Sequence, residues 1–136
     1  MAGPGPRLRS KCVWSELEPE ADGLRILATR YIPRGCPRAR YDVWMPNLGP
    51  SERLLKEYKA GAVPWTEFCQ AYSAEILGGG EVEPANPRIR NRGQKFTLRL
   101  LGHIARTQPV TLLCHCAEDE AQCHRHLLRA LVLRDG

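Results

Sequence analysis

The chain has 136 residues, enough for one domain with a buried core. Its 43% hydrophobic and 26% charged residues are typical of globular proteins and exclude collagen, coiled coils and full disorder. No stretch approaches the ~18 consecutive apolar residues that a membrane span needs, and no apolar secretory signal begins the chain. We therefore expect a soluble cytoplasmic protein without a membrane partner.

The charge balance permits an anionic partner but does not establish one, because genome composition also explains a preference for Arg over Lys. Twenty basic residues face fifteen acidic ones, and sixteen of the twenty are Arg, which binds phosphate or carboxylate through paired hydrogen bonds. That partner would be an anionic small molecule, or a nucleic acid bound by the basic segments 7–11, 34–40 and 88–99. No helix-turn-helix, zinc-finger or RNA-binding motif accompanies these segments.

The N-terminal half predicts two strands separated by turns. Residues 1–10 are expected to be a flexible basic segment. Strands are predicted over 11–15 and 24–32, with a polar turn at 17–23 between them. The Pro- and Arg-rich stretch 33–50 is expected to be a long ordered loop, a kind of segment that often carries function.

Two helices are predicted next. Ser51 has the position of an N-cap for a helix that ends near Ala60. Pro64 stands at the first turn of a helix over 65–77, and the three glycines that follow end it. The aromatic and apolar residues of that helix share one face: Trp65, Phe68, Tyr72 and Ile76.

Residues 78–92 are expected to form a loop. A further helix is predicted over 93–107, with its apolar face made by Phe96, Leu100 and Ile104.

The C-terminal third predicts an α/β unit. The continuous apolar run 110–114 is typical of a strand covered on both faces, and a helix is expected over 120–133. Together with the earlier strands, this indicates a single α/β domain over 11–136, with a short, mainly parallel sheet flanked by helices. Binding sites in such sheets gather at the carboxyl ends of strands, which is where Cys114 lies.

The segment 114–126 concentrates three of the six cysteines and three of the four histidines. The thiols of Cys114, Cys116 and Cys123, with a histidine as fourth ligand, would suit zinc or iron. The spacing is not that of a standard zinc knuckle, so a site without a cofactor is an equal alternative. Clustered cysteines and the missing signal peptide favour a reducing compartment.

A second interpretation is nucleophilic catalysis. Cys114 follows a strand and precedes a helix N-terminus, whose dipole stabilises a thiolate. His124 would act as base and Arg125 as a clamp for an anion. The acidic residues at 118–120 oppose this, because they repel both a thiolate and a phosphate.

A third interpretation is purely structural. His124 shares a helix face with Leu127, Leu128 and Leu131, and would point into the core with them. Arg125 and His126 would then point away, into solvent.

Several spaced motifs occur in an order similar to that of the domain of unknown function 488 family, over about residues 22–133. They are Asp22-Gly23-Leu24-Arg25, Ile26-Leu27, Arg30, Pro33-Arg34-Gly35, Asp42-x-Trp44, Leu48, Pro50-Ser51, Trp65, Phe68, Tyr72, Glu75, Leu112-Leu113-Cys114 and Cys123-His124-Arg125. The resemblance is to a branch that carries the Cys-His-Arg motif.

The resemblance implies a small α/β fold of unassigned biochemical activity. Thr29 stands where many members of the family have Asp. Some members replace the cysteines that match 114 and 123 with Tyr and Asn but keep the histidine that matches 124. Cysteine chemistry is therefore not shared by every branch.

These observations give the candidate site. If the strands are parallel neighbours, Arg30 and Arg34 reach the same edge as the cysteines. We expect an enzyme that acts on an anionic substrate there, with catalytic residues Cys114, Cys123, His124 and Arg125 and substrate-binding residues Arg30, Arg34 and Ser51. The alternatives are a metal or redox site at 114–126, a nucleic-acid-binding module, and ion pairs that join Arg30 and Arg34 to the acidic run 118–120.

Overall fold

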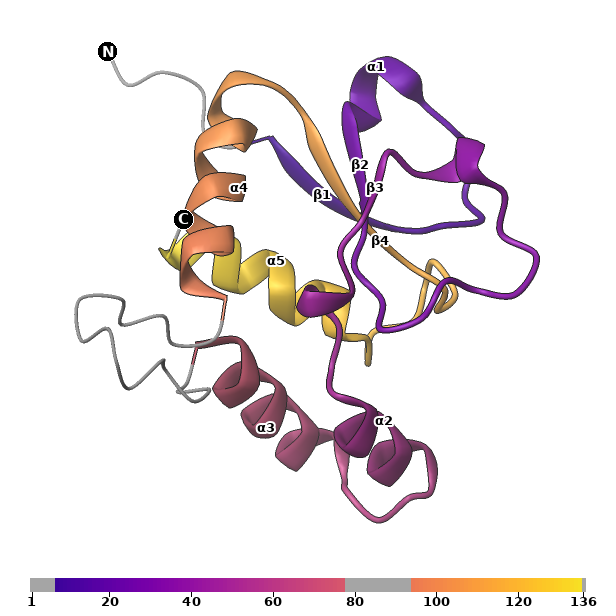
Figure 1. The fold of residues 1–136 in the computed structure, drawn as a ribbon, viewed down its shortest axis with the longest axis vertical. Coiled ribbons are helices and arrows are strands. Elements are labelled where there is room, and N and C mark those ends of the chain that lie inside the picture. Colours follow the sequence, from indigo (N-terminus) through magenta and orange to yellow (C-terminus); the bar gives the residue numbers. More distant parts are fainter. Residues whose placement is uncertain (1–6, 78–93, 136) are drawn as a thin grey trace, which may run out of the picture.

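The computed structural model describes residues 7–77 and 94–135, which form one sheet with helices packed against it (Figure 1). The strands are β1 (Leu8–Cys12), β2 (Leu24–Leu27), β3 (Val43–Trp44) and β4 (Val110–Cys114). The helices are α1 (Pro19–Asp22), α2 (Glu52–Lys59), α3 (Trp65–Leu77), α4 (Lys95–Thr107) and α5 (His124–Asp135), with 3-10 turns at Arg38–Arg40 and Pro46–Leu48. No helix in these two ranges is long and apolar enough to cross a membrane.

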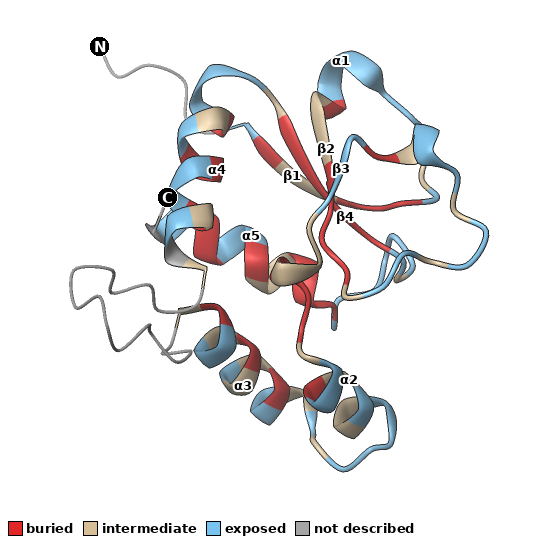
Figure 2. Ribbon diagram, in the orientation of Figure 1, coloured by how far each residue is buried: buried red, intermediate tan, exposed pale blue. Residues whose placement is uncertain are grey.

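The sheet has the strand order β1-β4-β2-β3, and every pair is parallel. β4 lies in the interior of the sheet, and all five of its residues are buried (Figure 2). This confirms the predicted strand at 110–114 and the predicted α/β class with a parallel sheet. Cys12 is the register partner of Cys114, so β1 and β4 end at the same edge.

The core lies on both faces of the sheet. Figure 1 shows α4 and α5 packed together along one face, where the main apolar cluster includes Ile26, Leu112 and Leu128. A smaller cluster covers the other face and includes Leu27 and Leu113. Neighbouring residues of one strand therefore serve opposite faces, as the two-residue period of a strand requires.

The predicted first strand is displaced. β1 begins at Leu8 and ends at Cys12, so the predicted boundary between residues 10 and 11 falls inside a strand. The backbone of Arg7 already bonds to Ala105 and Val110, at 2.8 Å each, which aligns the chain with β4. The tertiary pairing sets this start, and local composition does not show it.

Other boundaries differ as well. The second strand ends at Leu27 and not at residue 32, because the chain turns away after Ala28. The predicted turn at 17–23 contains α1, and the predicted loop at 33–50 contains β3. The predicted loop at 78–92 lies outside the described residues.

The helices are confirmed in type, with two corrections. α3 spans the predicted 65–77, whereas α5 begins at His124, four residues after the predicted start. α4 buries Leu98, Leu101 and Ala105, and leaves Phe96 and Leu100 exposed, so the predicted apolar face of this helix was wrong.

Gly49 permits a close approach: a Cβ there would lie 2.4 Å from the Arg30 nitrogen, and this contact holds the 46–50 segment against the end of β2.

Candidate functional site

Three thiols meet at the carboxyl end of β4. Cys114 ends that strand, Cys116 follows two residues later, and Cys123 directly precedes α5. The Sγ atoms of Cys114 and Cys123 lie 2.8 Å apart, and all three sulfurs lie within 4.8 Å of one another. All three are free cysteines. The sequence analysis predicted this gathering correctly.

Arg125 lies beneath the thiols and is completely buried. Its Nη1 donates to Cys114 Sγ at 3.4 Å and to the Cys116 carbonyl at 3.1 Å. Its Nη2 donates to the carbonyls of Ala117 and Glu118, at 2.9 and 3.0 Å. The prediction that Arg125 points into solvent was wrong, because the loop before α5 folds back over the helix and encloses the guanidinium.

The three thiols differ in acidity, and Cys116 is the one whose pKa is lowered. Hydrogen bonds from the Cys114 and Cys123 thiols lower the pKa of Cys116 to about 2. The same interactions keep the other two thiols protonated: the pKa of Cys114 rises to about 11 because of its hydrogen bond to Cys116, and that of Cys123 also rises. The Cys116 amide and Arg125 donate to Cys114 Sγ, which spreads the charge toward the buried cation.

His124 is held as a neutral ring. Its Nε2 donates to the Ala28 carbonyl at 2.5 Å, because a carbonyl only accepts. Burial lowers the pKa of His124, so Nδ1 carries a free lone pair, 4.0 Å from Cys123 Sγ. The ring also packs edge-on against Tyr72, with 5.6 Å between centroids. His124 therefore packs in the core, as the structural interpretation predicts, and also presents a nitrogen to Cys123, as the catalytic interpretation requires.

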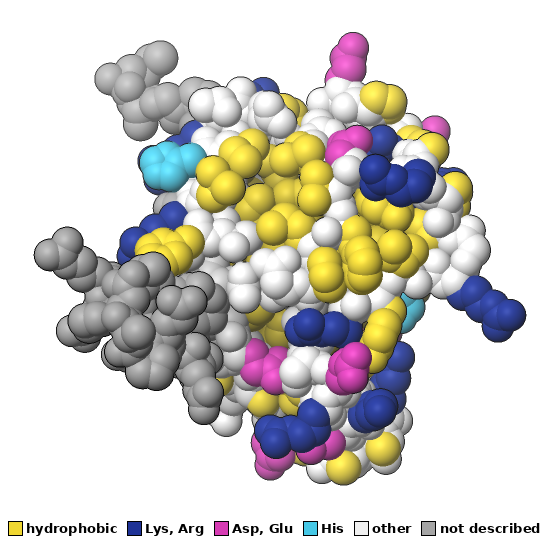
Figure 3. Space-filling view, in the orientation of Figure 1, with side chains coloured by type: hydrophobic (Ala, Val, Ile, Leu, Met, Phe, Trp, Pro, Cys, Tyr) yellow, Lys and Arg dark blue, Asp and Glu magenta, His cyan; other side chains and the backbone are white. Residues whose placement is uncertain are grey.

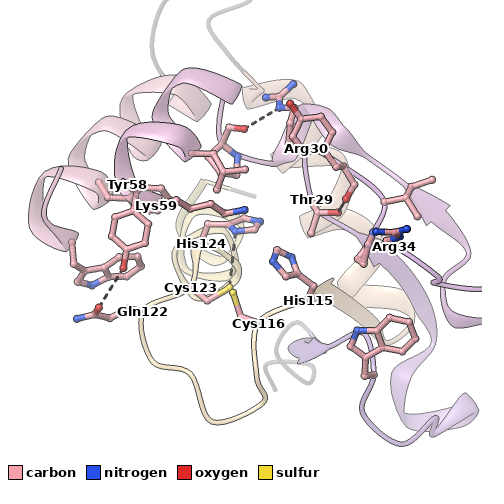
Figure 4. A pocket seen from close by; sticks show the side chains of 18 residues that line it. Thr29, Arg30, Arg34, Tyr58, Lys59, His115, Cys116, Gln122, Cys123 and His124 are labelled. Atoms are coloured by element: carbon pink, nitrogen blue, oxygen red, sulfur yellow. Dashed lines mark hydrogen bonds between the residues drawn. The ribbon is translucent and has the colours of Figure 1, made fainter. Parts of the chain in front are cut away.

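A cavity of about 440 Å³ opens beside the thiols. Its lining residues come from α2 and the residue before its N-cap, from α3, from the start of α5 and from the loops that follow β1, β2 and β4: Trp14, Thr29, Arg30, Tyr31, Ile32, Pro33, Arg34, Pro50, Leu55, Tyr58, Lys59, Trp65, Phe68, His115, Cys116, Gln122, Cys123 and His124. Figure 4 shows Tyr58, Lys59 and Gln122 on one side, Thr29 and Arg34 on the other, and His115 between them. Cys114 does not line the cavity; it lies behind Cys116, fully buried.

Three cations border the cavity without a carboxylate partner among the described residues: Arg30, Arg34 and Lys59. Arg30 donates to the carbonyls of Pro50 and Gly49, at 2.9 and 3.1 Å, which leaves its charge uncompensated. In the acidic run 118–120, the Glu118 carboxylate accepts from the Cys12 amide at 2.6 Å and from Ser15 Oγ at 2.7 Å. The predicted ion pairs between that run and Arg30 or Arg34 are therefore not formed in the described part of the chain.

Two candidate residues lie elsewhere. Ser51 is the N-cap of α2, where its Oγ accepts from the Leu54 amide at 3.2 Å and also bonds to Glu75. It does not line the cavity beside the thiols. His126, a candidate fourth metal ligand, uses its ring nitrogens toward Ser10 Oγ and the Glu120 carbonyl, at 3.4 and 2.8 Å.

Part of the basic segment 7–11 is paired within the chain. Lys11 is buried and paired with Asp22 at 2.9 Å, and Arg9 pairs with Glu18 at 3.4 Å. On the face drawn in Figure 3, the described basic side chains are interspersed with acidic and apolar ones. Residues 88–93 lie outside the described part. A nucleic-acid interface built from the three segments stays a prediction.

Sequence reasoning missed most of the cavity wall. Lys59 and Trp14 line it, and no motif marked them, while His115 lies in the predicted Cys-His cluster without having been given a role of its own. The shared helix face of Trp65 and Phe68 could have indicated this part of the wall, because both residues line the cavity. Thr29, which replaces the Asp of many family members, lines the cavity and donates its hydroxyl to the Tyr31 carbonyl at 2.6 Å.

The triangle formed by the sulfurs of Cys114, Cys116 and Cys123 has the chemistry of a site for a soft metal ion. Zinc–sulfur bonds of ~2.3 Å in a tetrahedral site separate the sulfurs by ~3.8 Å. The 2.8 Å between Cys114 and Cys123 is shorter, so a metal ion would have to spread these two thiols. His124 Nδ1 is the free nitrogen nearest to them.

These features define a small all-parallel α/β protein with a thiol-lined cavity at the carboxyl edge of its sheet. The chain belongs to the DUF488 family: a model described as the active DUF488-N3 subclade, DUF488-N3a, matches residues 9–136. The family resemblance of the sequence motifs is thereby confirmed. Comparison with curated proteins and with solved structures gives no match.

Proposed function

We propose that this protein is an enzyme that acts on an anionic substrate, in which the Cys116 thiolate bonds to an electrophilic atom while the bond from that atom to its leaving group breaks and the leaving group departs with the electron pair. One observation carries the proposal: the thiol whose pKa is lowered faces a cavity bordered by Arg30, Arg34 and Lys59. A thiolate is the nucleophilic form of cysteine, and uncompensated cations beside it attract an anion.

The other cluster residues have supporting roles in this proposal. Cys114 and Cys123 donate to the thiolate, and Arg125 contacts the cluster through Cys114 Sγ. His124 Nδ1 is a neutral base beside the thiols. In this proposal the nucleophile is Cys116, which the sequence analysis named as a metal ligand, and the predicted catalytic residues Cys114 and Cys123 are its protonated partners.

We place this activity in the cytoplasm. All six cysteines are free, and three of them are clustered close enough to react with one another, which a reducing compartment prevents.

The test compares two alkylating reagents, iodoacetate, which is an anion, and neutral iodoacetamide. We expect Cys116 to be the first cysteine that either reagent modifies, as located by mass spectrometry. The ratio of its rate with iodoacetate to its rate with iodoacetamide should be about tenfold higher than the same ratio for a free thiol such as glutathione. Changing Arg34→Gln and Lys59→Gln should remove the preference and leave the iodoacetamide rate intact. Lys56→Gln, an exposed lysine on the same helix, is the matched control.

Two outcomes contradict the proposal. If Cys116 reacts no faster than Cys69, the thiolate is not available to substrate. If the purified, untagged protein holds near-stoichiometric zinc or iron and all three clustered thiols are protected, the triangle is a metal site. The compact sulfur geometry makes that the second candidate function.

A further inference from the structure

The walls of the cavity are aromatic as well as cationic. Tyr58, Trp65 and Phe68 form one group, with centroid separations of 4.7 to 5.9 Å. Trp65 and Phe68 are nearly parallel, at 15°. Tyr58 and Trp65 remain half-exposed, so part of each ring is open to the cavity.

More apolar surface is exposed on the other side of the same cavity. Trp14 is 45% exposed, Tyr31 53% and Ile32 41%, and all three line it. Single exposed apolar side chains are ordinary, but several that share one cavity usually mark a binding site. The volume of about 440 Å³ lies in the range of small-molecule sites.

The cations lie at separate places on the rim. Lys59 is one residue beyond Tyr58, while Arg34 lies on the opposite side (Figure 4). Both side chains are exposed, and no ion pair within the described ranges uses either of them. A ligand that enters between these walls meets ring faces and positive charge together.

We propose that the substrate class of this cavity is an aromatic phosphate: a planar ring that packs on Tyr58 and Trp65 and a phosphate that binds Lys59, the cation next to those rings. The inference rests on the proposed function for its site, but it concerns binding alone. Ring faces favour a planar partner, and several cations around one cavity attract a phosphate dianion more strongly than a single carboxylate.

The test measures binding to C116S, which keeps the cavity and removes the nucleophile. The probes are 1-naphthyl phosphate and the four common ribonucleoside monophosphates, titrated by calorimetry. Ribose 5-phosphate lacks the ring, and the corresponding nucleosides and 1-naphthol lack the phosphate. We expect at least one aromatic phosphate to bind at least tenfold more tightly than both of its matched controls.

Two substitutions separate the contributions. Trp65→Leu should weaken the aromatic phosphate about tenfold and leave ribose 5-phosphate unchanged. Lys59→Gln should weaken both phosphates and spare 1-naphthol. Phe96→Leu and Lys56→Gln change exposed residues outside the cavity and serve as matched controls. An unchanged thermal transition of each variant shows that it is folded.

The outcomes distinguish this inference from the proposed function. If Cys116 shows the fast, anion-selective alkylation but no aromatic phosphate exceeds its controls, the enzyme proposal stands and this inference is overturned. If aromatic phosphates bind C116S while Cys116 in the unmodified protein is unreactive, the inference stands and the enzyme proposal fails.

Discussion

Arg125 shows how much one side chain organises at this site. Its guanidinium holds three successive loop carbonyls and one thiol, all within 3.4 Å. The loop between β4 and α5 therefore folds around a buried charge, whose closest interactions among charged or ionisable groups are with Cys114, Cys123 and Glu118. Removing the guanidinium leaves the buried carbonyls without donors.

Arg125→Lys tests this arrangement. Lysine cannot reproduce the planar fork of donors, so several buried carbonyls lose their partner. We expect a loss of about 3 kcal/mol in the free energy of unfolding, measured by urea denaturation. Arg129→Lys, on the same helix but exposed and bonded to one carbonyl, should cost less than about 1 kcal/mol. Equal losses for the two variants would contradict the role given to Arg125.

The pH dependence of Cys116 is a second prediction at this scale. With its pKa lowered to about 2, Cys116 stays a thiolate throughout the accessible acidic range. Its alkylation rate should be nearly constant from about pH 8 to pH 5, while Cys69, whose pKa burial raises, should slow about tenfold per pH unit. The measurement is site-resolved alkylation by mass spectrometry. A Cys116 rate that falls in parallel with that of Cys69 would disprove the shared-charge description.

Some features of the site could be predicted from the sequence and others could not. The clustering of Cys114, Cys123 and His124 was visible from their spacing on a strand end and a helix start. The burial of Arg125 was not, because helical periodicity fixes the direction of a side chain but not the path of the loop that covers it. Ser51 was placed in the site because it adjoins a motif, whereas its hydroxyl caps a helix.

At the scale of the elements, α3 and α4 show what periodicity settles. α3 packs against α2 and α5, and its apolar face, with Phe68, Tyr72 and Ile76 buried, was predicted correctly. α4 has apolar residues on more than one face, and contact with α5 and β4 selects Leu98, Leu101 and Ala105. The two-residue strand β3 is too short to have a pattern of its own and exists because it pairs with β2.

Ser51→Ala is the prediction that belongs to an element. Loss of the N-cap hydrogen bond should reduce the free energy of unfolding by about 1 kcal/mol. The alkylation rate of Cys116 should not change, because Ser51 does not line the thiol cavity. Thr66→Ala, exposed in the first turn of α3, should stay within about 0.5 kcal/mol of the unmodified protein. A slower Cys116 in S51A would restore the predicted role of Ser51 at the site.

For the whole molecule, a buried ion pair links acid stability to the sheet. Lys11 of β1 bonds to Asp22 of α1 at 2.9 Å, and both are buried. Burial alone would raise the pKa of Asp22, but hydrogen bonds from the Glu18 amide and from Lys11 outweigh it and lower the pKa below its usual value. The pair therefore stabilises the fold above the unfolded-state pKa of ~3.9 and is lost as the pH falls through the lower folded value.

Asp22→Asn should cost about 3 kcal/mol at neutral pH, because it leaves Lys11 buried without its carboxylate. The difference from the unmodified protein should shrink as the pH falls from about 4 to 2, where the native carboxyl is protonated as well. Urea denaturation across that range measures it, with the exposed Asp119→Asn as a control. A difference that is independent of pH would exclude the ion pair as its cause.

The position of β4 inside the sheet bears on how the chain acquires its structure during synthesis. Among the strands of the described residues, β1 pairs only with β4, and β2 meets β1 only through it. Before Val110–Cys114 has left the ribosome, β1 therefore has no partner strand and β2 can pair only with β3. Such long-range parallel pairing forms slowly. The sheet, and the thiol site at its edge, must assemble after most of the polypeptide has left the exit tunnel.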